Sequence, residues 1–145
     1  MEPHFKADVA SVIERSALAG VLKLMNIGCH LEGSRESDRM SREGFLKELF
    51  PNDANSLMLP QIFGSQGIHP HDSNQTTDEV MAEFLRVIRE NSRIVVIGET
   101  GLDYYRLTGD LEWQRARFRT HIRAAIEAKR PLVIHTRSAA DDTLR

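Results

Sequence analysis

The sequence has little of three features that would assign it to a specialised class of protein. Among its 145 residues only Cys29 is a cysteine, which excludes an internal disulfide and favours a reducing compartment, the cytoplasm or the nucleus. No apolar run approaches the roughly 18 to 20 residues that span a membrane, and residues 1–6 have no apolar stretch of the signal-peptide kind. We therefore expect an intracellular (cytoplasmic or nuclear) protein with no membrane partner.

The sequence also lacks an excess of positive charge. It has 19 Lys and Arg residues against 21 Asp and Glu residues, for a formal net charge of −2. A protein that binds nucleic acid through its overall charge would be strongly basic. Any contact with phosphate must therefore come from a local site, and a bound metal ion is the most plausible means.

What the sequence does contain is an ordinary globular composition and an alternation of helix and strand patterns. Hydrophobic residues make up 41% and charged residues 28%, and the length suits one domain over residues 1–145. Helices are predicted over residues 7–19, 37–50, 77–90 and 110–129, with another beginning in 138–145. Buried strands are predicted over residues 21–27, 93–98 and 132–134, a further strand, weakened by two glycines, over 62–68, and an irregular excursion over 52–61.

This alternation predicts a parallel α/β sheet with crossover helices. The unbroken β-branched run at residues 94–97 is typical of a strand that is buried on both faces. Two arrangements fit, a doubly wound open sheet and a (β/α)₈ TIM barrel. Since a complete barrel needs at least roughly 200 residues, about four βα units could supply only part of one.

Polar residues follow three successive predicted strands, in the segments GIHPHD, IGETGLDYY and PLVIHTR. His69 and Glu99 are 30 residues apart, and Glu99 and His135 are 36 apart. Both separations suit one βαβ unit of roughly 30 or more residues. We therefore expect these three side chains at similar heights on neighbouring strands, at the sheet edge where α/β proteins build their sites.

A carboxylate and imidazoles that converge in this way indicate a divalent-metal site. Asp72, Asp103 and Arg137 lie slightly further along, where they could orient ligands or contact substrate, and Arg137 could pair bidentately with a phosphate. Each residue also has a purely structural explanation. Glu99 could cap a helix, His135 could be a core histidine, and Asp103 could be a turn carboxylate that binds backbone amides.

The segments GIHPHD, IGETGLDYY and RPLVIHTRSAADDTL, in this order and at this spacing, resemble the TatD-like metal-dependent hydrolases (the TatD DNase family). The resemblance extends from about Asp8 to Arg145. It implies a (β/α)₈ barrel and divalent metal ions (Mg, Mn or Zn), up to two in a complete site. It also implies phosphodiester hydrolysis with DNA as substrate, of the 3′–5′ exonuclease type of deoxyribonuclease.

The resemblance also implies roles for individual residues. Glu99 matches the family's metal-bridging glutamate, His135 a metal-binding histidine, and His69 a position expected to contact substrate, as we expect of Asp103 and Arg137. No catalytic residue is assigned. The family's opening His-x-His strand and its later Thr-Asp-x-Pro segment have no counterpart here, and Gly28-Cys29-His30-Leu31-Glu32 resembles the opening motif only superficially. We therefore expect an incomplete barrel that is inactive, or nearly so, as a monomer.

Two alternatives remain open at this stage. One is a non-catalytic protein that uses the fold for binding or assembly, in which open sheet edges favour self-association. The other keeps the metal-dependent hydrolysis but directs it to amide or ester bonds.

Overall fold

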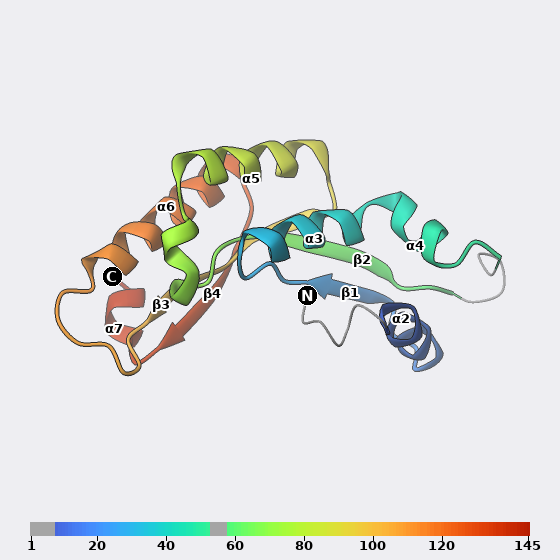
Figure 1. Cartoon of the computed structure of the whole chain (residues 1–145), viewed down its shortest axis with the longest axis horizontal. Coiled ribbons are helices and arrows are strands. Elements are labelled where there is room, and N and C mark those ends of the chain that lie inside the picture. The colour runs from blue at the N-terminus through green and yellow to red at the C-terminus, as the bar shows by residue number, and fades with distance from the viewer. Residues whose placement is uncertain (1–7, 53–57) are drawn as a thin grey trace.

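The computed structural model describes residues 8–52 and 58–145, so residues 1–7, including the first residue of the predicted helix over 7–19, and the centre of the predicted excursion lie outside the described residues. The described chain alternates helices and strands, as the sequence predicts (Figure 1). The elements are α2 (Val9–Leu18), β1 (Lys23–Asn26), α3 (Leu31–Ser41), α4 (Glu43–Leu49), β2 (Gln61–Gln66), η1 (Pro70–Gln75), α5 (Asp78–Glu90), β3 (Ile94–Asp103), α6 (Glu112–Ala128), β4 (Leu132–Arg137) and α7 (Ala140–Thr143).

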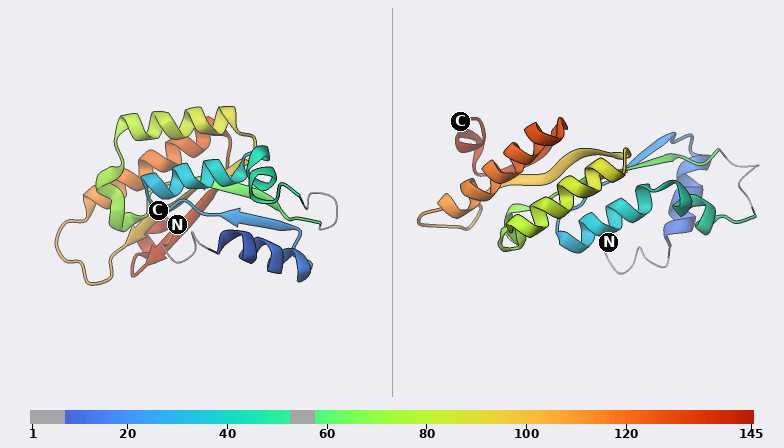
Figure 2. Two further views of the ribbon diagram at one scale, coloured as in Figure 1. Left: turned by 45° about the vertical axis from the view of Figure 1, so that its right-hand side comes forward. Right: turned by 90° about the horizontal axis from the view of Figure 1, so that it is seen from above.

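The four strands form one parallel sheet in the order β1-β2-β3-β4. Right-handed crossovers between neighbouring parallel strands place the connecting helices on one face of the sheet. Accordingly, α3 packs on β2 while α5 and α6 pack on β3, along the same side (Figures 1 and 2). A doubly wound sheet reverses its strand order at a switch point, and the described strands show no reversal. The arrangement is therefore that of a partial (β/α)₈ barrel.

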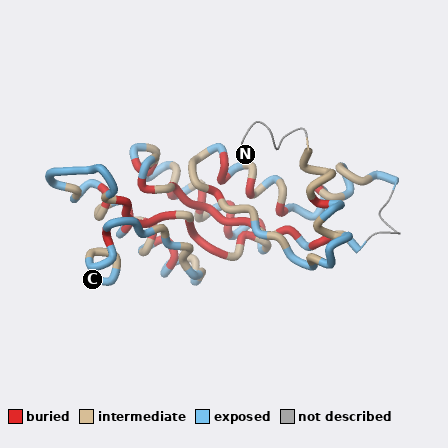
Figure 3. Tube along the Cα trace, turned by 90° about the horizontal axis from the view of Figure 1, so that it is seen from below, coloured by how far each residue is buried: buried red, intermediate tan, exposed pale blue. Residues whose placement is uncertain are grey.

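The largest apolar core lies between α5, α6 and β3. Phe84 of α5 and both Ile94 and Ile97 of β3 are fully buried there. Helix α5 begins where the Thr77 hydroxyl accepts a hydrogen bond from the Val80 N–H, at 3.3 Å. Such N-terminal caps satisfy a backbone donor that the helix itself leaves unpaired. Figure 3 shows buried residues concentrated along the middle of the sheet.

Helix α3 differs from the predicted helix over residues 37–50, which was wrong in both its start and its continuity. The helix begins at Leu31, where the His30 ring accepts a hydrogen bond from the Gly33 N–H, and it is separated from α4 at Arg42. Its buried residues are small: Gly33, Ser34, Ser37 and Ser41. This face has helical spacing but no apolar side chains, so hydrophobic periodicity could not reveal it. The segment around His30 is thus the start of α3.

The strands also depart from prediction in their limits and burial. Strand β3 continues past Gly98 to Asp103, whereas the predicted strand ended at residue 98. The outer strands β1 and β4 are only partly buried, so the prediction that both are buried was wrong. Leu22 beside β1 is 62% exposed and Ile134 in β4 is 47% exposed, because each outer strand is flanked by one strand in the described sheet. Helix α7 spans four residues, shorter than the predicted start over 138–145.

In the part of the chain that the structure describes, no helix combines the length and apolar character needed to cross a membrane.

Candidate functional site

The predicted site residues meet at the carboxyl-terminal edge of the sheet. His69 follows β2, Glu99 and Asp103 belong to β3, and His135 belongs to β4. One ligand atom from each of His69, Asp103 and His135 lies within 4.8 Å of the others. Glu99 adjoins them, since its Oε1 is 3.4 Å from His135 Nδ1. Of the remaining predicted residues, Asp72 lies in η1 and Arg137 ends β4 at the rim of this cluster.

The chain leading to His69 is fixed by hydrogen bonds at three consecutive residues, 67 to 69. The Ser34 hydroxyl donates to the Gly67 carbonyl at 2.9 Å and accepts from the Gly67 N–H at 3.1 Å. The next N–H, of Ile68, donates to His121 Nε2 at 3.2 Å. The N–H of His69 itself donates to the Cys29 carbonyl at 2.7 Å. Contacts from α3, α6 and the β1–α3 loop therefore fix the backbone from which the His69 side chain extends.

Asp103 is held from two sides and is only 1% exposed. Its backbone N–H donates to Gln114 Oε1 at 2.8 Å, and the Gln114 amide donates back to the Asp103 carbonyl at 2.9 Å. Its carboxylate accepts from the Tyr105 N–H at 3.0 Å and lies 3.0 Å from His135 Nε2. Burial alone would raise the pKa of Asp103, but these hydrogen bonds and the nearby imidazoles bring its pKa below the ordinary value. Asp103 is therefore a carboxylate at neutral pH.

His135 lies between two carboxylates. Its Nε2 is 3.0 Å from Asp103 Oδ2, and its Nδ1 is 3.4 Å from Glu99 Oε1. When Nε2–H donates to Asp103, a neutral imidazole presents its Nδ1 lone pair toward Glu99. Two electron-rich atoms, His135 Nδ1 and Glu99 Oε1, then face one another. A cation between them fits this donor set, and a carboxylate that holds the far N–H of a metal-binding histidine is a recurring arrangement.

The His69 ring is oriented by its own turn. Its Nδ1 accepts a hydrogen bond from the His71 N–H at 3.2 Å, at the start of η1. Burial and the neighbouring His135 ring lower the pKa of His69, which keeps the imidazole neutral at pH 7. With Nδ1 as an acceptor, the proton resides on Nε2, which is then a hydrogen-bond donor. His69 can therefore offer a donor to a substrate oxygen.

Glu99 is positioned by the loop that follows β1. Its N–H donates to the Gly28 carbonyl at 2.8 Å, and its Oε2 accepts from the Cys29 thiol at 3.3 Å. Burial, together with the hydrogen bond to Glu99, raises the pKa of Cys29 to about 11. The thiol is thus protonated and serves as the donor, which leaves Glu99 Oε1 facing His135.

Several residues of the site had no role in the sequence analysis. His71, a turn residue by its position before Asp72, has its Nε2 3.1 Å from Asp103 Oδ2. Ser34 and His121 hold the approach to His69, and Cys29 holds Glu99. Helical spacing along α6 could have suggested burial of His121, since it follows Phe118 by three residues. Only the fold could reveal the backbone group that it contacts.

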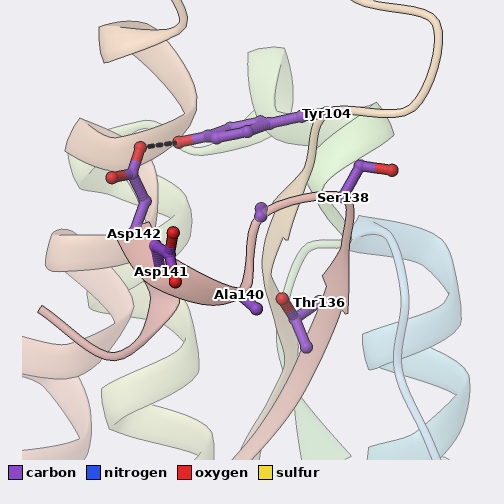
Figure 4. Close-up of a pocket in the computed structure, with 7 residues that line it drawn as sticks. Tyr104, Thr136, Ser138, Ala140, Asp141 and Asp142 are labelled. Carbon is purple, nitrogen blue, oxygen red and sulfur yellow. Dashed lines mark hydrogen bonds between the residues drawn. The ribbon is translucent and has the colours of Figure 1, made fainter.

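A separate hollow of about 510 Å³ lies beside β4 (Figure 4). It is lined by Tyr104, Thr136, Ser138, Ala139, Ala140, Asp141 and Asp142. The Tyr104 hydroxyl closes one side by donating to Asp142 at 2.9 Å. None of the predicted site residues lines this hollow, so the titratable cluster, rather than the hollow, is the candidate site.

Known proteins resemble the chain in sequence and in structure. An uncharacterized metal-dependent hydrolase TatD of Mycobacterium tuberculosis is 32% identical over 141 residues, which cover 94% of this chain and 47% of that protein. A 3′-5′ ssDNA/RNA exonuclease TatD of Escherichia fergusonii is 29% identical, over 94% of this chain and 46% of that protein. The YjjV TatD homologue of Escherichia coli shares the fold, with a TM-score of 0.67 and 22% identity over 97% of this chain and 49% of that structure.

The chain thus spans less than half the length of each of these proteins. Its likeness to the solved structure supports the partial (β/α)₈ barrel that the strand order indicates. The family described as "TatD related DNase" matches it over residues 1–145. The strand order, the converging histidines and carboxylates, and this match over the whole sequence agree: the chain belongs to the TatD-related DNase family.

Proposed function

We propose that this chain carries part of the divalent-metal site of a hydrolase that cleaves phosphodiester bonds. The observation that carries the proposal is the His135 imidazole between the carboxylates of Glu99 and Asp103. Glu99 Oε1 and His135 Nδ1 would be the metal ligands, and Asp103 would orient His135 through its Nε2–H. Carboxylate and imidazole donors together suit Mg, Mn or Zn. The alternative ligand set, His69 with Asp103 and His135, uses the same corner of the sheet.

The substrate that we propose is DNA, cleaved from its 3′ end. The support is that relatives such as the Escherichia fergusonii protein are named 3′-5′ ssDNA/RNA exonucleases. A divalent ion bound here would polarise a phosphoryl oxygen and lower the pKa of a bound water. The residues of this chain would then bind and orient the phosphodiester. The His69 Nε2–H would donate to a phosphate oxygen, and the Arg137 guanidinium would pair with its charge.

The first experiment measures metal binding directly, separately from catalysis. Mn²⁺ binding to the 145-residue chain is followed by electron paramagnetic resonance for wild type, Glu99→Ala, Asp103→Asn and a control, Glu127→Gln. We expect Asp103→Asn to weaken binding by about 10- to 100-fold, as loss of an orienting carboxylate does, and Glu99→Ala to weaken it at least as much. Glu127 is a 62% exposed carboxylate on α6, so its variant should bind like wild type.

The same four proteins are then assayed for Mg²⁺- or Mn²⁺-dependent release of nucleotides from single-stranded DNA. We expect slow release by wild type, since two ligands hold a metal weakly, and none by Glu99→Ala. Equal Mn²⁺ affinity of wild type and Glu99→Ala would refute the ligand assignment. Binding that depends on Glu99, together with hydrolysis of an ester or amide substrate in place of DNA, would refute the substrate but keep the metal site.

A second candidate function is assembly through the outer strands. Exposed apolar side chains lie at both described edges of the sheet, with Leu22 and Met25 at β1 and Ile134 at β4. Unpaired edges with apolar side chains favour pairing with another chain. Light scattering over a range of concentrations, with and without Mn²⁺, tests this function. Growth in size that Ile134→Lys abolishes and that metal does not affect would support it, and a constant monomer mass would exclude it.

A further inference from the structure

We propose that Tyr105, Arg106 and Arg137 form a subsite that binds a phosphate group of single-stranded nucleic acid beside the candidate metal site. The inference rests on the proposed hydrolase function and deepens it, because it names two further residues, Tyr105 and Arg106, that would act with Arg137 on a phosphate of the substrate strand. Tyr105 is 40% exposed, and both arginines are exposed. All three are therefore accessible to a strand approaching the site.

The position of this subsite follows from the strands. Arg137 comes two residues after His135 in β4, and residues two apart along a strand point to the same face. Arg137 is also paired with Asp103 across the β3–β4 ladder. The backbone N–H of Tyr105 donates to Asp103 Oδ1 at 3.0 Å. The subsite therefore shares Asp103 with the candidate metal site and forms its rim.

The three side chains form one stack. The guanidinium carbon of Arg137 lies 3.6 Å from the centroid of the Tyr105 ring, and that of Arg106 lies 4.9 Å from it. A guanidinium that stacks on an aromatic ring keeps its N–H donors free, because they lie in the guanidinium plane. The Tyr105 ring thus holds the two guanidinium groups close together, and their N–H donors stay available to a ligand. A phosphate oxygen pair is the ligand that such forks match.

Among the described residues, no carboxylate neutralises the charge of either arginine. Arg35 and Arg115, by contrast, each lie within 4.0 Å of two or more carboxylates. Within residues 8–52 and 58–145, no carboxylate oxygen lies within 4.0 Å of a guanidinium nitrogen of Arg106 or Arg137. The protein has a formal net charge of −2, so this pair of free cations is a local feature. It supplies the local phosphate contact that the overall charge cannot.

The backbone conformation of Arg106 allows its charge to be removed by a substitution that should not destabilise the fold. Its φ of 60° is left-handed, a conformation that glycine adopts at lower cost than a residue with a Cβ atom. Arg106→Gly should therefore keep or raise stability while it removes one cation. A loss of binding in that variant could not be attributed to unfolding.

The experiment measures fluorescence anisotropy of a labelled single-stranded oligodeoxynucleotide with the 145-residue chain in EDTA, so that neither metal nor hydrolysis contributes. Compared with wild type, Arg106→Gly and Arg137→Gln should each weaken binding on the order of ten-fold at low salt. The double variant should reduce the slope of log affinity against log salt by about 0.7, since the subsite holds one phosphate and each phosphate contact on a single strand contributes about 0.7. Tyr105→Ala should weaken binding, and Tyr105→Phe should retain it because the stack uses the ring.

Arg123→Gln is the matched control, an exposed arginine on α6 that loses the same charge. An equal loss of affinity in Arg123→Gln and Arg137→Gln would overturn the subsite, and so would the absence of salt-dependent binding by wild type. Since the assay contains no metal, retained oligonucleotide binding by a chain that fails to bind Mn²⁺ would overturn the proposed metal site and leave the subsite standing.

Discussion

Two helix–sheet interfaces of this protein are built from opposite chemistry. Between α5 and β3, Phe84 packs against Ile94 and Ile97 in an apolar core. Between α3 and β2, the fully buried residues of the helix are Ser34, Ser37 and Ser41. The first interface is stabilised by burial of apolar area, and the second by hydrogen bonds to the backbone of the strand.

The serine interface and the apolar interface also differ in which parts of the structure they hold in position. The Ser37 hydroxyl donates to the Asn26 carbonyl at 2.8 Å and accepts from the Ser65 N–H at 2.9 Å, which joins α3 to both β1 and β2. Small side chains also allow close approach, since a Cβ atom at Gly64 would lie 2.6 Å from the Ser37 hydroxyl. Directional contacts fix the backbone at the approach to His69, whereas the apolar core supplies stability without specifying one backbone atom.

The largest expected effect is on the apolar interface. Phe84→Ala should lower the free energy of unfolding by about 3–5 kcal/mol, because it removes a fully buried ring and leaves a cavity. Urea unfolding followed by circular dichroism measures the change. Leu144→Ala is the control, since Leu144 is 87% exposed and its truncation should stay within about 0.5 kcal/mol of wild type. Equal losses in the two variants would contradict the assignment of this core.

An intermediate effect is expected at the serine interface. Ser34→Ala leaves both the N–H and the carbonyl of buried Gly67 without this partner, which should cost about 1–3 kcal/mol of unfolding free energy. The exposed Ser92 offers the matched control, Ser92→Ala, for which we expect almost no change. If Ser34→Ala proved as stable as wild type, the hydroxyl contacts would not hold this interface, and the comparison with the apolar core would fail.

The smallest effect is a pH dependence at His121, which contacts the chain just before His69. Burial lowers the pKa of His121 below its ordinary value of 6.5, so folding favours the neutral ring that accepts from the Ile68 N–H. Its contribution to stability is therefore complete above pH 6.5 and is lost as the pH falls from 6.5 toward the lower pKa of the folded state.

Urea unfolding at pH 7.5 and pH 5.5 tests this dependence. Wild type should be less stable at the lower pH, and His121→Gln, which cannot titrate, should lose less between the two. His69, whose pKa is lowered in the same direction, would account for the remaining slope. A steeper loss in His121→Gln than in wild type would contradict the assignment.

The site could be predicted from sequence to the extent that it depends on strand order. His69, Glu99 and His135 each come directly after, or close after, a run of apolar residues that predicts a strand, and parallel strands bring the ends of such runs to one edge of a sheet. That reasoning correctly brought the three side chains together. It did not predict that Asp103 belongs to β3 and contacts His135, because the predicted strand stopped at Gly98. A polar strand end has no hydrophobic signal.

By itself, the sequence determined the alternation of strands and helices, the parallel sheet and the edge at which the titratable residues gather, because each depends on apolar periodicity and on chain order. Only the tertiary structure decided which backbone groups Ser34, His121 and Cys29 hold, and that Tyr105 stacks with Arg137. These contacts join segments far apart in the chain. Hydrogen bonds and ring contacts depend on distances of a few ångströms, and residue order does not specify them until packing has fixed the helices on the sheet.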